Sequence, residues 1–87
     1  MPEKTVTLTN ATGLHARPAR IFAKQAASYA ADVTVSKGGD AVNAKSVLSV
    51  LTLDCHQGDV ITIRTEGEGA ETALEELVQL VESGFGE

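Results

Sequence analysis

The sequence has little cysteine and no long apolar run. A single cysteine, Cys55, among 87 residues cannot form an internal disulfide, which is typical of proteins kept in a reducing compartment. No apolar run approaches the ~18 residues of a membrane span, and the chain does not open with the basic and apolar segments of a signal peptide. We therefore expect a cytoplasmic protein without direct membrane insertion.

Positive charge is scarce in the second half of the chain. The net charge is −5, which argues against bulk binding of nucleic acid. Nine of the twelve acidic residues lie from residue 54 onward, where Arg64 is the only basic one. By contrast, three of the seven basic residues, Arg17, Arg20 and Lys24, fall within eight positions. The chain is acidic overall and locally basic over residues 17–24.

Hydrophobic periodicity predicts seven elements in the order β-α-β-β-α-β-α. With no internal repeat or linker, residues 1–87 make a single domain. This order predicts an α+β fold, an open-faced β-sandwich in which three helices pack on one face of a four-stranded antiparallel sheet. The expected strands cover 3–9, 33–37, 41–45 and 60–65, and the expected helices cover 16–29, 47–52 and 70–83.

The two longer helices each show an apolar stripe at helical spacing. Ile21 falls outside the first stripe, and we expect it to be partly buried. The predicted stripes are Ala19, Phe22, Ala23, Ala26 and Ala30 in the first helix, and Ala73, Leu74, Leu77, Val78 and Val81 in the last.

The stretch 13–19, Gly-Leu-His-Ala-Arg-Pro-Ala, carries the strongest chemical signal. Gly13 permits a sharp turn before His15, and Pro18 suits the first turn of a helix. The first amides of a helix attract anions, and the Arg17 guanidinium matches a phosphate. This pattern predicts that His15 is a phosphoryl acceptor, with Arg17 and the amides of residues 16 and 17 around the phosphate. The alternative is a histidine that only packs at the start of the helix.

The same stretch resembles the active-site signature of HPr, the histidine-containing phosphocarrier family of the bacterial phosphoenolpyruvate:sugar phosphotransferase system. The likeness extends over all 87 residues, including Lys45-Ser46-Val47-Leu48 and the Gly-Phe-Gly-Glu ending. It implies that His15 takes a phosphoryl group on Nδ1 from enzyme I and passes it to the IIA domain of a sugar permease. It also implies a monomer that is a substrate of phosphotransferases, not an enzyme, and that needs no cofactor.

Ser46 allows two interpretations that do not exclude each other. It is a good N-cap for a short helix. The resemblance also implies a regulatory phosphorylation, made by an HPr kinase/phosphorylase and read by a catabolite-control transcription factor. Family members with this regulation commonly have Ile-Met-Gly after the serine, whereas this chain has Val47-Leu48-Ser49.

The short helix 47–52 has more apolar residues than two turns can bury, so we expect some to be exposed beside the basic strip. The alternative is that all of them are core. The resemblance implies that this region docks partner proteins. We name as the docking surface Ala16, Arg20, Lys24, Ala27, Val47, Leu48 and Leu51.

Two other segments of the sequence do not predict a functional site. The spacing of Asp54, Cys55 and His56 does not match a metal site, so we expect an ordinary loop and no metal. The glycines at 67 and 69 lack the context of a nucleotide-binding loop. Two alternatives to the sugar carrier stay open: a carrier in a nitrogen-related or regulatory branch, and an adaptor that binds proteins without being phosphorylated.

Overall fold

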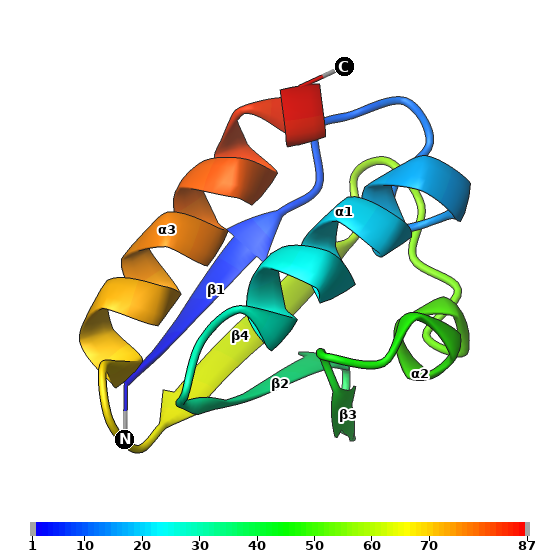
Figure 1. The fold of residues 1–87 in the computed structure, drawn as a ribbon. Helices are drawn as coiled ribbons and strands as arrows, with labels where there is room; N and C mark the ends of the chain where they lie inside the picture. The colour runs from blue at the N-terminus through cyan, green and yellow to red at the C-terminus, as the bar shows by residue number, and fades with distance from the viewer. Residues whose placement is uncertain (1, 87) are drawn as a thin grey trace.

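The computed structural model describes residues 2–86 and forms one antiparallel sheet with helices on one side (Figure 1). The strand order is β1-β4-β2-β3, and each neighbouring pair is antiparallel. The predicted α+β fold class is confirmed. The strands are β1 Glu3–Thr7, β2 Asp32–Lys37, β3 Asp40–Asn43 and β4 Val60–Glu66; the helices are α1 Ala16–Ala27, α2 Val47–Leu51 and α3 Ala70–Glu82, followed by the 3₁₀ turn η1 Gly84–Gly86.

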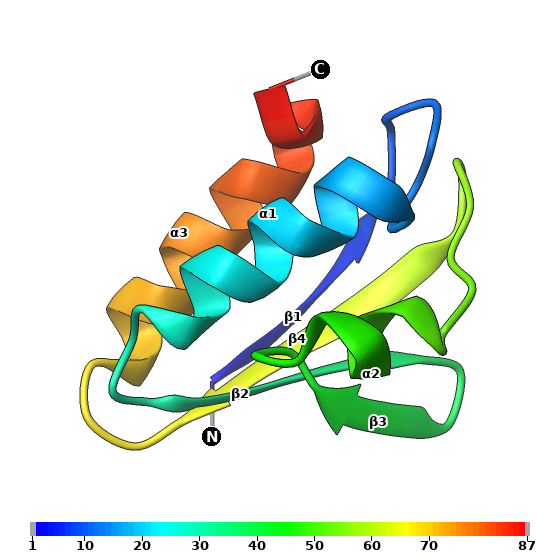
Figure 2. The same cartoon turned by 45° about the vertical axis from the view of Figure 1, so that its right-hand side comes forward.

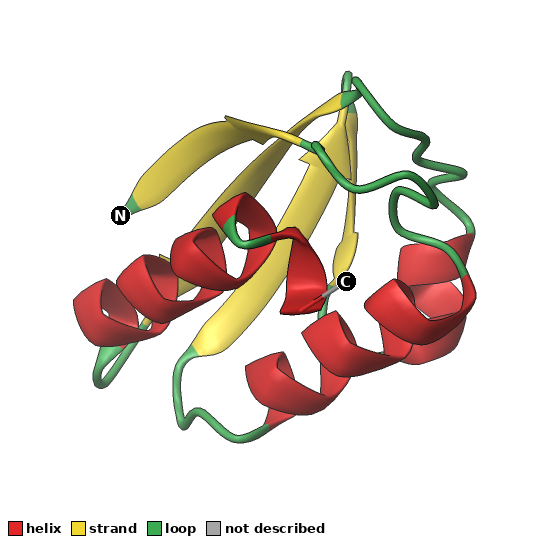
Figure 3. Ribbon diagram, turned by 90° about the horizontal axis from the view of Figure 1, so that it is seen from above, coloured by secondary structure: helices red, strands yellow, loops and turns green. Residues whose placement is uncertain are grey.

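The molecule has two layers, with α1 and α3 lying across the sheet and α2 beside the β3 edge (Figures 2 and 3). Alternate residues of the central strands, such as Val35 and Ile63, are fully buried beneath the helices, and these two are also register partners. Phe22 of α1 and Leu77 of α3 cover them from the other layer without exposed surface. Burial of these side chains from both layers is the main source of stability.

Pairing between β1 and β4 determines where the connecting loops meet. Thr7, the last residue of β1, is paired with Val60, the first residue of β4. Beyond this pair, Leu8 N donates to Asp59 O over 2.9 Å, and Gly58 N donates to Leu8 O over 2.8 Å. The loop after β1 and the loop before β4 therefore leave the sheet side by side.

Three predicted element ends are wrong by two residues, and the other ends that differ do so by one residue. The first strand ends at residue 7 because Leu8 continues the pairing only through loop residues. The third strand spans 40–43 because Asn43 closes a turn, its side chain accepting from Lys45 N and its carbonyl from Ser46 N.

The first helix also ends earlier than predicted. Ser28 closes it at Ala27, since its amide and hydroxyl both donate to Gln25 O. Ala30 therefore lies beyond the helix and is exposed, against the prediction that it is buried. The rest of the α1 stripe is buried, and Ile21 is half-buried as expected. In α3, Leu74 is only partly buried.

Within residues 2–86, no helix combines the length and the apolar character needed to cross a membrane.

Candidate functional site

The start of α1 presents His15 as the residue that precedes the first helical turn. His15 has extended backbone angles, with φ −121° and ψ 155°, and no side chain caps the helix. Gly13 has a φ of +62°, so the turn into this position uses the left-handed region that glycine tolerates. Pro18 is buried in the first turn, where a missing amide costs nothing. The sequence thus leaves the first amides of α1 available to an anion.

The two ring nitrogens of His15 have different surroundings. The side chain is 34% exposed, yet Nε2 is buried and has no hydrogen-bond partner. Nε2 is the ring nitrogen that faces Asp54, at 3.4 Å from Oδ1. The two nitrogens of the ring are therefore not equivalent.

The loop before β4 packs directly against the turn before His15. Leu14 N donates to Cys55 O over 3.1 Å. A Cβ atom added to Gly13 would lie 2.4 Å from Cys55 O and 2.7 Å from the Cα atom of His56. Glycine at position 13 is therefore required by both its φ angle and the approach of this second loop.

This approach brings Asp54 and His56 to His15. The distance from His15 Nε2 to Asp54 Oδ1 is 3.4 Å, and the distance from His56 Nε2 to the same oxygen is 3.5 Å. The centroids of the two imidazole rings are 4.9 Å apart. Asp54 has a φ of +51°, uncommon for a residue with a side chain. The loop therefore holds a carboxylate and a second imidazole against the predicted acceptor.

Asp59 and Lys37 fix the shape of this loop. Asp59 Oδ2 accepts from His56 N over 2.8 Å and forms an ion pair of 3.0 Å with Lys37. The hydrogen bond from the His56 backbone, followed by the Lys37 ammonium, lowers the pKa of Asp59 below its usual value. Lys37 Nζ also donates to Asp54 O over 3.0 Å.

Cys55, the residue between Asp54 and His56, is a free cysteine and is fully buried. Burial raises the pKa of its thiol, so this side chain is an inert part of the core.

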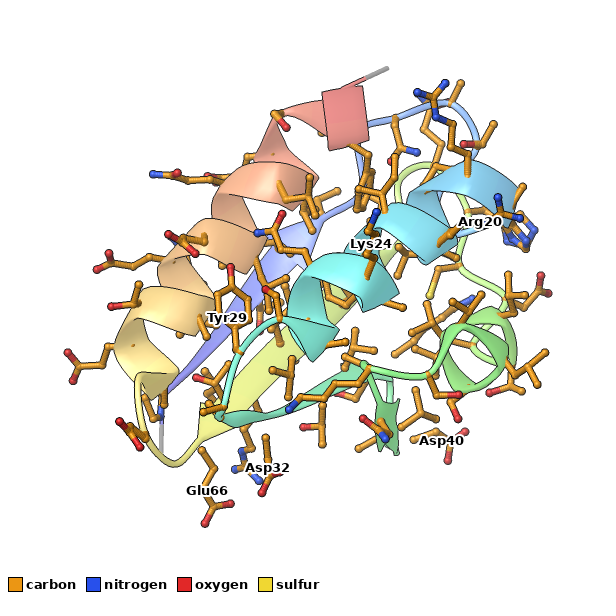
Figure 4. All side chains as sticks on the ribbon, viewed as in Figure 1. Arg20, Lys24, Tyr29, Asp32, Asp40 and Glu66 are labelled. Atoms are coloured by element: carbon orange, nitrogen blue, oxygen red, sulfur yellow. The ribbon has the colours of Figure 1, made fainter. Side chains whose placement is uncertain are left out.

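The basic residues of α1 lie near His15 but are not joined to it. Arg17 is exposed, and it makes no hydrogen bond or ion pair with His15. Arg20 and Lys24 project outward from the same helix (Figure 4). Ala16 is exposed and has a φ of +48°. The predicted cationic strip exists as an open surface beside the histidine.

Helix α2 contacts α1 and presents the apolar part of the docking surface. Leu48 is 77% exposed, whereas Val50 is fully buried. Val47 and Leu51 are half-buried. The expectation that some apolar residues of this helix are exposed is confirmed. Ala27, the last residue of α1, is exposed as well.

Ser46 performs the predicted capping role. Its hydroxyl accepts a hydrogen bond of 3.3 Å from Ser49 N, and its side chain is half-buried at the start of α2. The short helix is thereby closed at its first turn.

Sequence reasoning missed Asp54 and His56 as neighbours of His15. Local spacing gave no signal, because the contact is between loops far apart in the chain. A signal was present in the topology: if the first and last strands pair, the loop after one meets the loop before the other.

Comparisons with known proteins identify the family of the chain. A family profile described as PTS HPr component phosphorylation site matches residues 2–83. The phosphocarrier protein HPr of Vibrio cholerae is 44% identical over 82 residues, covering 94% of this chain and 96% of that protein. The phosphocarrier protein HPr of Streptomyces coelicolor is 46% identical over 88 residues, covering 100% and 95%.

Solved structures give the same result. The crystal structure of HPr from Thermoanaerobacter tengcongensis superposes with a TM-score of 0.97 at 42% identity, covering 100% of this chain and 98% of that one. Because sequence and fold agree over nearly the whole length, the chain belongs to the HPr family of phosphocarrier proteins of the phosphotransferase system.

Proposed function

We propose that this protein carries a phosphoryl group on His15 Nδ1, taking it from phospho-enzyme I and passing it to the IIA domain of a sugar permease. The observation that carries the proposal is that His15 Nε2 is buried 3.4 Å from Asp54 Oδ1 at an uncapped helix start, which leaves Nδ1 as the nitrogen for the phosphoryl group. The Nδ1 lone pair attacks phosphorus while the bond to the donor breaks, and the reverse exchange delivers the group to the next acceptor. The chain acts as a substrate of phosphotransferases and needs no cofactor of its own.

The surroundings of Nδ1 suit a phosphate that must be released again. The start of a helix favours an anion by ~0.3–1 kcal/mol, and by up to ~2 when it is partly buried. A charge-assisted hydrogen bond from Arg17 would add ~1.5–3 kcal/mol, while the amides of residues 16 and 17 belong to the helix start already counted. Arg17 is exposed and not paired with His15, so its guanidinium can turn toward the phosphate. A stabilisation of a few kcal/mol holds the phosphoryl group on His15 and still allows its transfer to the next acceptor.

Partner recognition belongs to the docking surface. The exposed Leu48 offers apolar area on α2, and Arg20 and Lys24 offer positive charge on α1, the helix that α2 contacts. Such a surface suits partners with an apolar centre and an acidic rim. We propose that a monomer in the cytoplasm uses this surface for enzyme I and for IIA domains in turn.

The direct test is the intact mass after incubation with enzyme I and phosphoenolpyruvate. The wild-type protein should gain one acid-labile phosphoryl group, because Nδ1 forms a phosphoramidate. His15→Ala should gain none, and Ser46→Ala should gain the group as the wild type does. A label retained by His15→Ala would show that the acceptor lies elsewhere.

We further propose that Ser46 is a regulatory site, phosphorylated by an HPr kinase/phosphorylase, with the modified form read by a catabolite-control transcription factor. Ser46 is half-buried and directly precedes the docking residues Val47 and Leu48. A phosphate there would place about two negative charges on the docking surface, against partners with acidic rims.

Substitution of Ser46 by a carboxylate tests this regulation. Ser46→Asp should slow phosphoryl transfer from enzyme I several-fold while stability changes little, since a carboxylate still caps a helix. The measurement is the initial transfer rate, with Ser46→Ala as the uncharged control. Equal rates for Ser46→Asp and wild type would remove the electrostatic basis of the regulation.

The exposed Leu48 also favours a second candidate, an adaptor that binds proteins through the docking surface without phosphorylation. The mass experiment separates the two, because an adaptor would gain no phosphoryl group from enzyme I. A carrier in a nitrogen-related branch would gain the group but deliver it to a different IIA-type acceptor.

A further inference from the structure

We propose that His15, Asp54 and His56 form a binding site for a divalent transition-metal ion of the zinc type, which shares the histidine of the phosphoryl site. Each residue offers one ligand atom, and these atoms all lie within 4.8 Å of one another. Two imidazoles and a carboxylate are a ligand set that zinc accepts in proteins, with the fourth position left to water.

Two of the three distances between ligand atoms agree with a tetrahedral ion, and the third, between the two imidazoles, lies within 4.8 Å. Two ligand atoms that each lie ~2.0–2.1 Å from a zinc ion are ~3.3–3.4 Å apart at the tetrahedral angle. The two contacts of Asp54 Oδ1, at 3.4 Å to His15 Nε2 and 3.5 Å to His56 Nε2, are close to this separation. The contact between Asp54 Oδ1 and His15 Nε2 is not a hydrogen bond, and this buried nitrogen has no hydrogen-bond partner. A metal ion between these atoms would satisfy it.

The loop backbone places these ligands and leaves their side chains free to adjust. Leu14 N and Cys55 O hold the loop against the His15 turn, and Lys37 Nζ holds Asp54 through its carbonyl. The side chains of Asp54 and His56 are 71% and 63% exposed. The third ligand distance, between the two imidazoles, can therefore shorten by rotation of the exposed His56 side chain toward the buried His15 Nε2.

A second carboxylate lies behind His56. His56 Nδ1 is 3.8 Å from Asp59 Oδ2, on the side of the ring opposite the nitrogen that faces Asp54. Metal-ligating histidines commonly have a carboxylate at their other nitrogen, which orients the ring and increases its basicity. The ring of His56 thus lies between Asp54, a proposed metal ligand, and Asp59, which would orient the ring.

The site has a consequence for phosphoryl transfer, and this consequence alone rests on the proposed function. A cation at Nε2 withdraws electron density from the His15 ring, so Nδ1 becomes a weaker nucleophile. Bound metal should therefore slow phosphorylation by enzyme I, and His56→Gln should relieve the inhibition.

Calorimetry with Zn²⁺ on unphosphorylated protein without a histidine tag tests the site itself. We expect one ion per chain, and at least tenfold weaker binding for Asp54→Asn and for His56→Gln. Asp40→Asn, which removes a carboxylate at the β2–β3 turn, is the matched control and should bind as the wild type does. Binding by wild type weaker than ~100 μM, or a loss below threefold in either variant, would overturn the three-ligand site.

Imidazole NMR gives an independent readout, because the chain has only two histidines. Zn²⁺ should shift the ring signals of both His15 and His56 in the wild type. A shift confined to one ring would overturn the shared site. Both experiments use the protein alone, so their failure would leave the phosphocarrier proposal standing, and failed phosphorylation would leave the metal site standing.

Discussion

The two ends of α1 differ in how completely their polar groups are hydrogen-bonded. At the C-terminal end, polar groups are satisfied by local and long-range partners. The Tyr29 hydroxyl donates to Glu76 Oε1 over 2.6 Å and accepts from Gln25 Nε2 over 3.0 Å. Lys45 Nζ donates to Tyr29 O, also over 3.0 Å. Figure 4 shows Tyr29 between α1 and α3, where these bonds join the two helices.

At the N-terminal end the polar groups are left open. No side chain caps the helix, His15 Nε2 is buried without a hydrogen-bond partner, and Arg17 is not paired with His15. Positive φ angles at Ala16 and Asp54 add backbone strain. One end of the helix thus has its polar groups hydrogen-bonded, and the other has unsatisfied groups where the proposed phosphoryl group and metal ion would bind.

Gly13→Ala should produce the largest change at the open end. The new Cβ would lie 2.4 Å from Cys55 O and would occupy a φ of +62°. Backbone strain of ~1–3 kcal/mol and overpacking of a similar size should lower the free energy of unfolding by about 3 kcal/mol. Phosphoryl acceptance should fall as well, since the turn that presents His15 is displaced. Chemical denaturation and the mass assay measure the two effects.

Gly39→Ala is the matched control for this substitution. Gly39 lies in the β2–β3 turn without a positive φ, and an added Cβ there would meet nothing within 4 Å. The free energy of unfolding of Gly39→Ala should differ from that of the wild type by less than about 1 kcal/mol. A similar loss of unfolding free energy in both variants would mean that the contact of Gly13 with the loop before β4 does not determine the structure around His15.

The same contrast explains how much the sequence could predict. The elements, the sheet and the buried stripes follow from hydrophobic period, which is a local signal. Ser46 as a cap follows from residue type and position. The place of His15 just before α1 was predictable because Gly13, His15 and Pro18 lie within six positions of the chain.

Contacts between loops were not predictable in this way. Asp54 and His56 reach His15 only because β1 and β4 pair and bring their loops together. The end of α1 was also missed, because it depends on Ser28, whose amide and hydroxyl both donate to Gln25 O. Both failures concern interactions that periodicity does not encode.

Tyr29→Phe should have a moderate effect, confined to the satisfied end. Loss of the hydroxyl removes the bonds to Glu76 and Gln25 and should cost about 1 kcal/mol of unfolding free energy. Phosphoryl acceptance should match the wild type, because the substitution is at the far end of α1. A several-fold fall in the transfer rate would contradict the separation of the two ends.

The smallest expected effect is on the titration of Tyr29. Burial, followed by the hydrogen bond to Glu76, raises the pKa of this phenol above its usual value. The fold therefore favours the neutral phenol; this stability is fully present below pH ~10, the unfolded pKa, and is lost as pH rises through the higher folded pKa. Tyr29 is the only tyrosine and the chain has no tryptophan, so phenolate absorbance reports it alone. Glu76→Gln should lower the folded pKa but leave it above the value for unfolded protein, because burial is the larger cause. A folded pKa equal to the unfolded one in the wild type would show that Tyr29 is solvated, and that the satisfied end of α1 is as open as the end that begins at His15.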